Sequence, residues 1–559
     1  MSRNFERPLI VQSDHTVLLQ TGLPSSAEAR DGLAPFAELV KSPEHVHTYR
    51  ITPLSLWNAA ALGVQVDQVI QILKRFSRFD LPPSLIREIR ERFSRYGRLR
   101  LVPGEADCLI LETHEEDLLE QLASNARIRP LFASQPRAGR VDVLEANRGL
   151  LKQALVHLGW PVEDEAGFVQ GEPLPMALRS AGRTGIPFAL RDYQVESVDA
   201  FHAGGTLRGG SGVIVLPCGA GKTMVGLAVM SRLKTSTLVL TTSITALRQW
   251  REELLERTSL TGEQIGEYSG AVKEVAPVTL STYQILTHRK SRQEPFTHFE
   301  LFRLRNWGLL IYDEVHLLPA PVFRVLAEIQ ARRRLGLTAT LVREDGREED
   351  VFSLIGPKRF DLPWRELEQQ GFIAAASCVE VRIPLSLALR RRYYAASDRD
   401  AFRLACTNPA KIPVVRRLIQ RHQGESILVI GQYLSQLREL AEALKAPLLT
   451  GKTRQGERDD LYARFRAGQL AVLVVSKVAN FAVDLPAASV AIQVSGTFGS
   501  RQEEAQRLGR ILRPKPGVNQ AHFYTLVSRE TVEAEYAGRR QIFLAEQGYS
   551  YTIEEKEAG

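Results

Sequence analysis

The sequence predicts an α/β protein with two parallel-sheet domains in tandem, preceded by a smaller α+β region. Three observations support this fold class. An apolar run at 212–215 leads through a glycine-containing loop into the helical pattern 224–230. Apolar strands alternate with helices from about residue 190 to about 365, and a second alternating series follows. Such alternation is typical of a parallel sheet with helices on both faces.

The expected strands can be named individually. In the first series they are 212–216, 237–241, 278–281, 307–312 and 334–338. In the second series they are 426–430, 471–475, 490–494 and 521–526, with helical patterns at 434–444 and 456–466 between them. Two such domains in tandem predict a cleft between them.

The N-terminal third has a different pattern. Apolar residues repeat at helical spacing over 66–76 and 85–93, and a strand is expected at 99–102, which predicts a winged-helix-like region. Its arginines suit either a phosphate backbone or an ordinary solvated face; they are Arg87, Arg90, Arg92, Arg95, Arg98 and Arg100. The acidic stretch 163–175 is expected to be a surface loop. We divide the chain into 1–130, a linker at 131–185, and the two parallel-sheet domains at 186–365 and 366–559.

Composition narrows the function classes. The formal net charge of +8 suits a polyanionic partner without requiring one. The four cysteines are scattered without a CxxC pair, which argues against a zinc site, an iron–sulfur cluster and a disulfide framework. Without a signal core or a membrane-length apolar stretch, we expect a cytoplasmic protein that does not contact a membrane.

The glycine-containing loop is a candidate phosphate site. Backbone N–H groups in such a loop point into a concavity at a helix N-terminus, where the helix dipole favours anions. Lys222 is expected to reach the terminal phosphates of a nucleotide, and Thr223 to hold Mg²⁺. Leu216 stands where the strict motif has glycine, so this is the looser form of the loop. The loop residues expected to bind ATP are Leu216, Pro217, Cys218, Gly219, Ala220, Gly221, Lys222 and Thr223.

Two adjacent carboxylates follow the apolar strand at 307–312. Asp313 is expected to bind Mg²⁺, and Glu314 to orient and deprotonate the water that attacks the γ-phosphate. Taken alone, the pair would be better explained as a charged turn after a strand. Combined with the phosphate loop upstream, it predicts nucleotide hydrolysis.

In this order, the two motifs resemble the motor of a superfamily 2 helicase or translocase, with tandem RecA-like domains. The resemblance implies that Arg191 and Gln194 read the adenine. It also implies that Thr242, Tyr283, Thr453 and Lys477 hold a nucleic-acid strand. The segment 506–513 resembles the arginine-finger motif, so Arg510 and Arg513, three apart on a helix, are expected to neutralise charge on the γ-phosphate.

One segment resembles the XPB-type DNA helicases more closely. Thr338-Ala-Thr-Leu-Val-Arg-Glu-Asp345 is similar to their hinge motif followed by an Arg-Glu-Asp element that separates strands. Residues 6–14 and 42–50 resemble the bacterial branch of that family. The resemblance therefore implies a monomeric, ATP- and Mg²⁺-dependent 3′-5′ helicase that acts on forked DNA in repair, with a nuclease or another repair protein as a possible partner. Arg343, Glu344 and Asp345 are the expected unwinding residues, and 131–185 could be a remnant of a damage-recognition domain.

Several alternatives remain open at this stage. The protein could be a double-strand DNA translocase that never separates strands, or a nucleotide-gated DNA clamp that recruits repair partners. Residues 387–408 could be the family's thumb-like insertion, whose basic and aromatic residues suit single-stranded DNA, or an amphipathic packing helix. Ala479-Asn480 stands where better-characterised members have a Gly-Asp pair.

Overall fold

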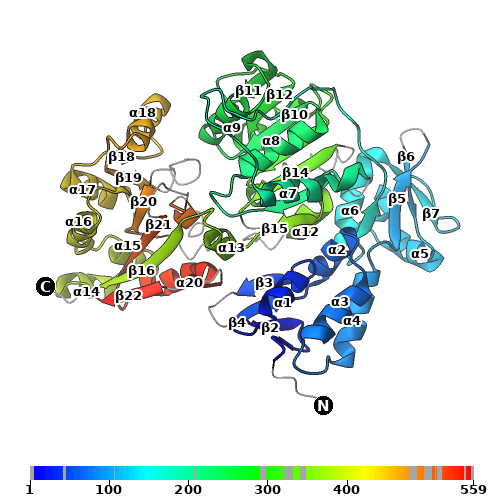
Figure 1. Cartoon of the computed structure of the whole chain (residues 1–559), viewed down its shortest axis with the longest axis horizontal. Helices are drawn as coiled ribbons and strands as arrows, with labels where there is room; N and C mark the ends of the chain where they lie inside the picture. Colours follow the sequence, from blue (N-terminus) through cyan, green and yellow to red (C-terminus); the bar gives the residue numbers. More distant parts are fainter. Residues whose placement is uncertain are drawn as a thin grey trace. The chain divides into compact units, whose positions relative to one another are not determined.

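The computed structural model describes most of the chain and divides it into two compact units (Figure 1). Unit 1 comprises Met1–Val40, His45–Leu216 and Gly221–Asp361, and unit 2 comprises Lys41–Glu44, Pro217–Ala220 and Leu362–Gly559. The described residues are 6–41, 46–105, 108–206, 209–289, 297–318, 322, 332–339, 348–476, 488–496, 507–509, 511–512, 519–546, 549 and 551–555.

A small sheet with four helices opens unit 1. Its strands are β1 (Leu9–Val11), β2 (Thr16–Gln20), β3 (Glu38–Lys41) and β4 (Val46–Arg50), in the order β1-β2-β4-β3. The helices are α1 (Ser26–Leu33), α2 (Pro53–Ala61), α3 (Val66–Phe76) and α4 (Pro83–Ser94). The helical spacing read from the sequence is confirmed, because Val69, Leu73, Leu85 and Ile89 are fully buried in one core with the strands.

A second four-stranded sheet follows. It has the order β7-β6-β5-β8, formed by β5 (Leu99–Pro103), β6 (Cys108–Glu112), β7 (Arg140–Leu144) and β8 (Val162–Asp164), with helices α5 (Glu116–Ser124) and α6 (Arg148–His157). The boundary expected after residue 130 falls inside this sheet. The acidic stretch 163–175 is expected to be a surface loop, but its first two residues belong to β8. Its Asp164 is ion-paired, since Arg148 and Lys152 of α6 each lie 2.7 Å from one of its carboxylate oxygens.

The first parallel sheet has the order β11-β12-β10-β13-β14-β9-β15. Each expected strand of the first series is confirmed within a residue or two. The strands are β9 (Ser211–Val215), β10 (Thr237–Thr241), β11 (Ile265–Tyr268), β12 (Val278–Thr282), β13 (Leu309–Asp313), β14 (Arg333–Thr338) and β15 (Lys358–Asp361). The helices are α7 (Asp192–His202), α8 (Lys222–Leu233), α9 (Ile244–Arg257), α10 (Tyr283–Leu286), α12 (Glu348–Leu354) and the 3₁₀ turn η6 (Val315–Leu317).

Unit 2 contains the second parallel sheet, in the order β18-β19-β17-β20-β21-β16-β22. Its strands are β16 (Ala375–Ile383), β17 (Ser426–Gly431), β18 (Leu448–Leu449), β19 (Val472–Ser476), β20 (Ala488–Gln493), β21 (Gln520–Ser528) and β22 (Tyr551–Glu555). Its helices are α13 (Trp364–Gln369), α14 (Leu387–Tyr394), α15 (Asp398–Cys406), α16 (Lys411–Arg421), α17 (Leu434–Leu444), α18 (Gln455–Arg466) and α20 (Val532–Glu546). The four expected strands and two expected helices are confirmed.

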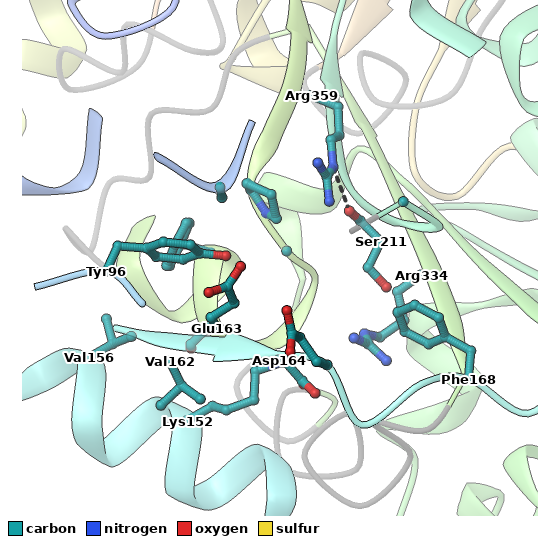
Figure 2. Close-up of a pocket in the computed structure, with 17 residues that line it drawn as sticks. Tyr96, Lys152, Val156, Val162, Glu163, Asp164, Phe168, Ser211, Arg334 and Arg359 are labelled. Carbon is teal, nitrogen blue, oxygen red and sulfur yellow. Dashed lines mark hydrogen bonds and ion pairs between the residues drawn. The ribbon is translucent and has the colours of Figure 1, made fainter. Parts of the chain in front are cut away.

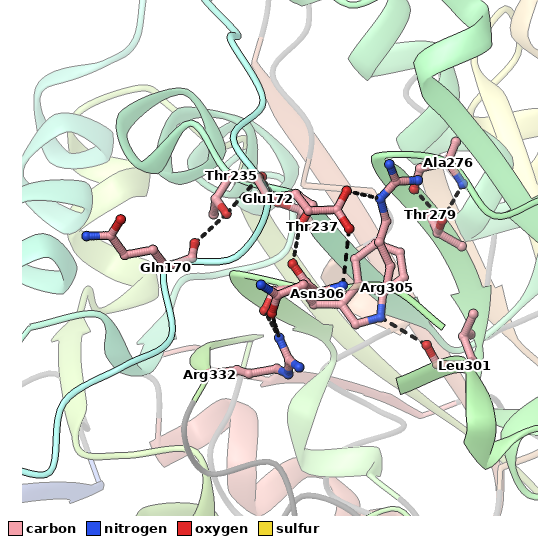
Figure 3. Close-up of polar contacts among 12 residues, drawn as sticks. Gln170, Glu172, Thr235, Thr237, Ala276, Thr279, Leu301, Arg305, Asn306 and Arg332 are labelled. Atoms are coloured by element: carbon pink, nitrogen blue, oxygen red, sulfur yellow. Dashed lines mark hydrogen bonds and ion pairs between the residues drawn. The ribbon is translucent and has the colours of Figure 1, made fainter. Parts of the chain in front are cut away.

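Polar contacts fix the chain where it enters the first parallel sheet (Figure 3). The Thr235 hydroxyl donates to the Gln170 carbonyl at 2.6 Å, and Arg305 Nε donates to Glu172 Oε2 at 2.7 Å. Gly171 lies against Gly308 so closely that a Cβ on Gly171 would stand 2.2 Å from the Gly308 nitrogen. These contacts lie at the amino ends of β10 and β13, opposite the edge at which the phosphate loop emerges.

A charged cavity of about 70 Å³ lies between the second small sheet and the first parallel sheet (Figure 2). Glu163 and Asp164 of β8 line one side, and Arg334 of β14 and Arg359 of β15 line the other. Burial lowers the pKa of each of these two arginines to about 10. Charged residues of β8, β14 and β15 therefore face one another across this cavity.

The arginine-rich N-terminal segment is largely ion-paired. Arg90 pairs with Asp67 at 2.7 Å, Arg95 with Glu91 at 3.0 Å and Arg98 with Glu115 at 3.2 Å. These pairs support the solvated-face interpretation over a row of cations that binds a phosphate backbone. Separately, none of the helices in the described part of the chain has the length and apolar character needed to cross a membrane.

Both interpretations of residues 387–408 find support in the helix pair α14 and α15. α15 buries Phe402 and Cys406 and is an amphipathic packing helix. α14 has no buried residue; its Tyr394 is 70% exposed, and Arg390 pairs with Glu530 at 3.2 Å. α14 is therefore an exposed basic and aromatic helix, and α15 beside it is packed into unit 2.

Candidate ATP-hydrolysis site

The phosphate loop leads from β9 into α8. Gly219 and Gly221 adopt positive φ values of 86° and 78°. These values lie in the left-handed region, which glycine enters without steric cost. Gly221 is the N-cap of α8, so Lys222 begins the helix at its positive dipole end. The loop therefore has the backbone form expected of an anion-binding turn.

Gln194, which is expected to read the adenine, lies against this loop. Its side-chain oxygen accepts a hydrogen bond from the Arg191 backbone N–H at 3.0 Å, and the residue is only 4% exposed. A Cβ placed on Gly221 would stand 2.6 Å from Gln194 Nε2. Glycine at 221 thus permits the close approach between α7 and the loop.

The carboxylate pair stands at the carboxyl end of β13. Glu314 has a positive φ of 53°, which is uncommon for a residue other than glycine and costs conformational energy. Its Oε1 lies 3.6 Å from Lys222 Nζ. The strand end and the loop therefore bring together the two residues that the sequence assigned to catalysis and phosphate binding.

Asp313 is held by two aromatic residues. Trp250 Nε1 of α9 donates to Asp313 Oδ2 at 3.1 Å, and the Tyr283 hydroxyl donates to the Asp313 backbone oxygen at 2.9 Å. The Trp250 ring reaches this position over Gly226 of α8, where a Cβ would stand 2.4 Å from the ring. Tyr283, expected to hold a DNA strand, is 3% exposed beneath the carboxylate.

The hinge motif contacts the same carboxylates. His316 Nδ1 lies 2.6 Å from Thr338 Oγ1 and 3.5 Å from Glu314 Oε2. The Ala339 backbone N–H also donates to the Glu314 carboxylate. The segment after β14 is therefore linked directly to the proposed base.

Burial and neighbouring charges shift the pKa values of the two acids in opposite directions. Burial and the Glu314 charge raise the pKa of Asp313 to about 6. Burial also disfavours the Glu314 carboxylate, but Lys222 and His316 oppose it, and the net pKa of Glu314 is lowered. Such divergence between neighbouring acids is typical of functional sites.

Two loops expected to hold a nucleic-acid strand show internal bonds. Gln284 Nε2 donates to the Thr242 carbonyl at 2.5 Å, which ties the loop after β10 to the start of α10. In unit 2, the Thr453 hydroxyl accepts from the Thr450 backbone N–H at 3.0 Å. These bonds fix the backbone of both loops.

Six of the predicted site residues lie outside the described part of the chain. They are Arg343, Glu344, Asp345, Lys477, Arg510 and Arg513. Ala479 and Asn480 also lie outside it. Arg507, three residues before Arg510, lies within the described part of the chain. It is fully buried, and its guanidinium donates to the side-chain oxygen of Gln493 in β20.

Sequence reasoning missed the residues that position the carboxylates. The sequence pattern assigned no individual role to Trp250, His316 or Thr338. In the structure Trp250 contacts Asp313, His316 contacts Glu314, and Thr338 contacts His316. Of these three residues, only His316 could have been found from the sequence, because it lies two residues after Glu314. Trp250 lies 63 residues from Asp313, and that contact requires the folded sheet.

Comparison with family models covers three parts of the chain. Residues 367–559 match the ERCC3/RAD25/XPB C-terminal helicase model. Residues 187–343 match a model described as the type III restriction enzyme res subunit, and residues 9–135 match a helicase conserved C-terminal domain model.

Curated relatives are similar over nearly the whole chain. A protein of Kineococcus radiotolerans named DNA 3′-5′ helicase XPB is 55% identical, over 98% of this chain and 96% of its own. The protein of the same name from Mycobacterium tuberculosis is 54% identical, over 98% and 97%. A protein of Antonospora locustae, named general transcription and DNA repair factor IIH helicase/translocase subunit XPB, is 36% identical, over 98% and 81%.

Proposed function

This chain belongs to the XPB family and is an ATP-dependent 3′-5′ DNA helicase, and we propose which of its residues carry out that activity. The observation that carries the assignment is the convergence of Lys222, Asp313 and Glu314 at the carboxyl ends of β9 and β13, the two strands that flank β14. The names of the relatives favour strand separation over a plain translocase or a DNA clamp.

We assign the hydrolytic roles as follows. Lys222 and the loop amides hold the terminal phosphates, and Glu314 accepts a proton from the attacking water. Lys222 and His316 lower the pKa of Glu314, which keeps it ionised and ready to act as a base at neutral pH. Arg510 and Arg513 neutralise charge on the γ-phosphate; this role rests on the motif alone.

The donor set suits Mg²⁺. The Thr223 hydroxyl and the Asp313 carboxylate offer the oxygen ligands that this ion prefers. Bound there, Mg²⁺ would neutralise phosphate charge. Trp250 keeps one oxygen of Asp313 in a fixed orientation. We assign Tyr283 the same positioning role, because its hydroxyl donates a hydrogen bond to the Asp313 backbone oxygen.

We propose that the hinge motif senses hydrolysis through Glu314. The Ala339 amide donates to this carboxylate, and Thr338 contacts its neighbour His316. Movement of Glu314 toward water would therefore change the hydrogen bond to Ala339, at the start of the segment that carries Arg343, Glu344 and Asp345.

The finer features of substrate and setting are also part of the proposal. We propose a fork of single- and double-stranded DNA as substrate, held in part by the loops at Thr242, Thr453 and Lys477. We propose action as a monomer in DNA repair, with a nuclease or another repair protein as partner. A cytoplasmic location is supported by four cysteines that are all free thiols.

The direct test replaces Glu314 with Gln in the full chain. We expect ATP binding to persist and turnover to fall by roughly 10²- to 10⁴-fold, because the amide keeps the shape but cannot accept the proton. The measurements are nucleotide binding and steady-state phosphate release with and without DNA. Glu263→Gln, at an exposed position of the same unit, is the matched control and should be unchanged. Turnover near that of the wild type in Glu314→Gln would refute the assignment.

A further inference from the structure

A second group of chemically active side chains lies in unit 2, away from the ATP-hydrolysis residues. His422 directly follows α16, Glu425 directly precedes β17, and His522 is the third residue of β21. A turn joins the first two, since the Glu425 N–H donates to the His422 carbonyl at 3.1 Å. Strands β17 and β21 are both parallel to β20, so all three residues lie at the amino edge of the sheet.

The side chains of this His–Glu–His cluster converge. One potential ligand atom from each lies within 4.8 Å of the others. His422 Nδ1 is 2.8 Å from Glu425 Oε1, and the two imidazole rings are 4.6 Å apart between centroids. The His422 side chain is 7% exposed and that of Glu425 37%, so the cluster is anchored inside and open to solvent on one side.

The surrounding hydrogen bonds orient the cluster as outer-shell partners orient metal ligands. His422 Nε2 lies 2.8 Å from the Tyr524 hydroxyl, which leaves Nδ1 directed toward Glu425. The Ser489 hydroxyl bonds to the Glu425 carboxylate. A ligating histidine commonly uses its second ring nitrogen in this way, which fixes both the tautomer and the ring orientation.

The local charges also permit a cation. Arg421 is the nearest strong cation on α16, and it pairs with Glu554 at 3.3 Å while it hydrogen-bonds to Tyr524. The pKa of Glu425 is lowered: burial opposes ionisation, but the bonds from His422 and Ser489 favour it. The Glu425 carboxylate is therefore held in place by both His422 and Ser489.

We propose that His422, Glu425 and His522 form a binding site for one divalent transition-metal ion of the Zn²⁺ class. Two imidazoles and one carboxylate are a donor set that Zn²⁺ accepts, with a fourth position left to water. The ion would tie the end of α16 to the starts of β17 and β21 and so brace the second parallel sheet. The scattered cysteines argue only against thiolate sites, and this site uses none.

The test is a metal titration of the full chain with Mg²⁺–ADP present, so that the phosphate loop is occupied. We expect calorimetry with Zn²⁺ to give one site, and Co²⁺ to give the ligand-field absorption of a low-coordinate nitrogen and oxygen site. His522→Ala and Glu425→Gln, which leave the buried His422 in place, should each weaken binding by about tenfold or more. Zn²⁺ should raise the unfolding temperature of the wild type but not of His522→Ala.

His114→Ala removes an exposed histidine of unit 1 and is the matched control, with wild-type affinity expected. Equal Zn²⁺ affinity in the wild type and His522→Ala would overturn the proposal, as would the absence of binding to the wild type. The cluster would then be a hydrogen-bonded chain from Glu425 through His422 to Tyr524.

Discussion

Glu314 and Asp313 show how a strand end can prepare two acids for different tasks. Glu314 occupies a left-handed backbone conformation that its neighbours must stabilise, since such strain persists only where the surroundings enforce it. Asp313 is buried beside this charge, and its pKa is raised to about 6. In the nucleotide-free protein, the ionised Asp313 is therefore an energetic cost that a bound cation would remove.

This cost makes stability depend on pH. The pKa of Asp313 is raised on folding, so its ionisation destabilises the folded state as the pH rises from about 4 through about 6. We predict that Asp313→Asn stabilises the nucleotide-free protein at pH 8 by an amount on the order of 2 kcal/mol and has a much smaller effect near pH 4, where the carboxyl group is largely protonated in the folded state and begins to be protonated in the unfolded state. Thermal or urea unfolding at both pH values measures this, and ATPase activity should be lost at pH 8.

An equal effect of the substitution at the two pH values would contradict this account. Asp361→Asn is the matched control, because Asp361 is half-exposed and pairs with Lys358 at 2.8 Å away from the carboxylate pair. Its replacement should not produce a gain in stability at pH 8.

Helix α8 shows how close packing supports the site. Its Gly226 leaves room for the Trp250 ring, which in turn donates to Asp313. The same face of the helix contacts Leu337 of β14. A methyl group at this position would therefore act on the carboxylate pair through Trp250, without touching nucleotide.

We predict that Gly226→Ala destabilises the protein by about 1–3 kcal/mol, the usual cost of overpacking a core. It should also raise the Mg²⁺ concentration needed for half-maximal ATPase activity, because Asp313 loses its fixed orientation. Gly538→Ala in helix α20 is the matched control: nothing lies within 4 Å of its Cβ, so it should be neutral or stabilising by up to about 1 kcal/mol. Unfolding curves and Mg²⁺ titrations distinguish the two. If both variants behave alike, the packing argument fails.

The two parallel sheets share one topology. Numbered by their order along the chain, the strands of each sheet are arranged 3-4-2-5-6-1-7. In the first sheet, strand 1 is β9 and leads into the phosphate loop. In the second, strand 1 is β16, and the segment 384–394 that follows it contains no glycine. The repeat therefore has the same fold but not the backbone freedom that an anion-binding turn requires.

Because Lys222, Asp313 and Glu314 are distinct from Arg343, Glu344 and Asp345, stepping and strand separation should be separable. We predict that replacing Arg343, Glu344 and Asp345 together by alanine abolishes unwinding of a tailed duplex while most DNA-stimulated ATPase activity remains. Strand-displacement and triplex-displacement assays on one preparation measure the two functions. Gly346-Arg-Glu-Glu-Asp350 beside them offers a control at Arg347 and Glu348, whose replacement should leave both activities intact.

Equal loss of ATPase activity and unwinding in the triple variant would indicate a structural role for the segment. Unwinding at the wild-type rate would remove strand separation from the functions of these three residues.

The sequence by itself determined the tandem α/β fold, the two series of strands and the identity of Lys222, Asp313 and Glu314. These features are local in the sequence. The strand, the glycine loop and the helix are contiguous, and the two carboxylates directly follow an apolar strand. The sequence pattern did not predict β11, β15, β16, β18 and β22. Glu380 and Arg382 interrupt the apolar run of β16, and β22 is a polar edge strand with Glu554 and Glu555.

Tertiary structure decided what surrounds those residues. Trp250 and His316 reach the carboxylates, and Thr338 reaches His316, only because parallel strands deliver their carboxyl ends to one edge of the sheet. The same physics placed His422 beside His522, a hundred residues further along the chain, at the opposite edge of the second sheet. Contacts of this kind depend on strand order, and a linear pattern carries no record of strand order.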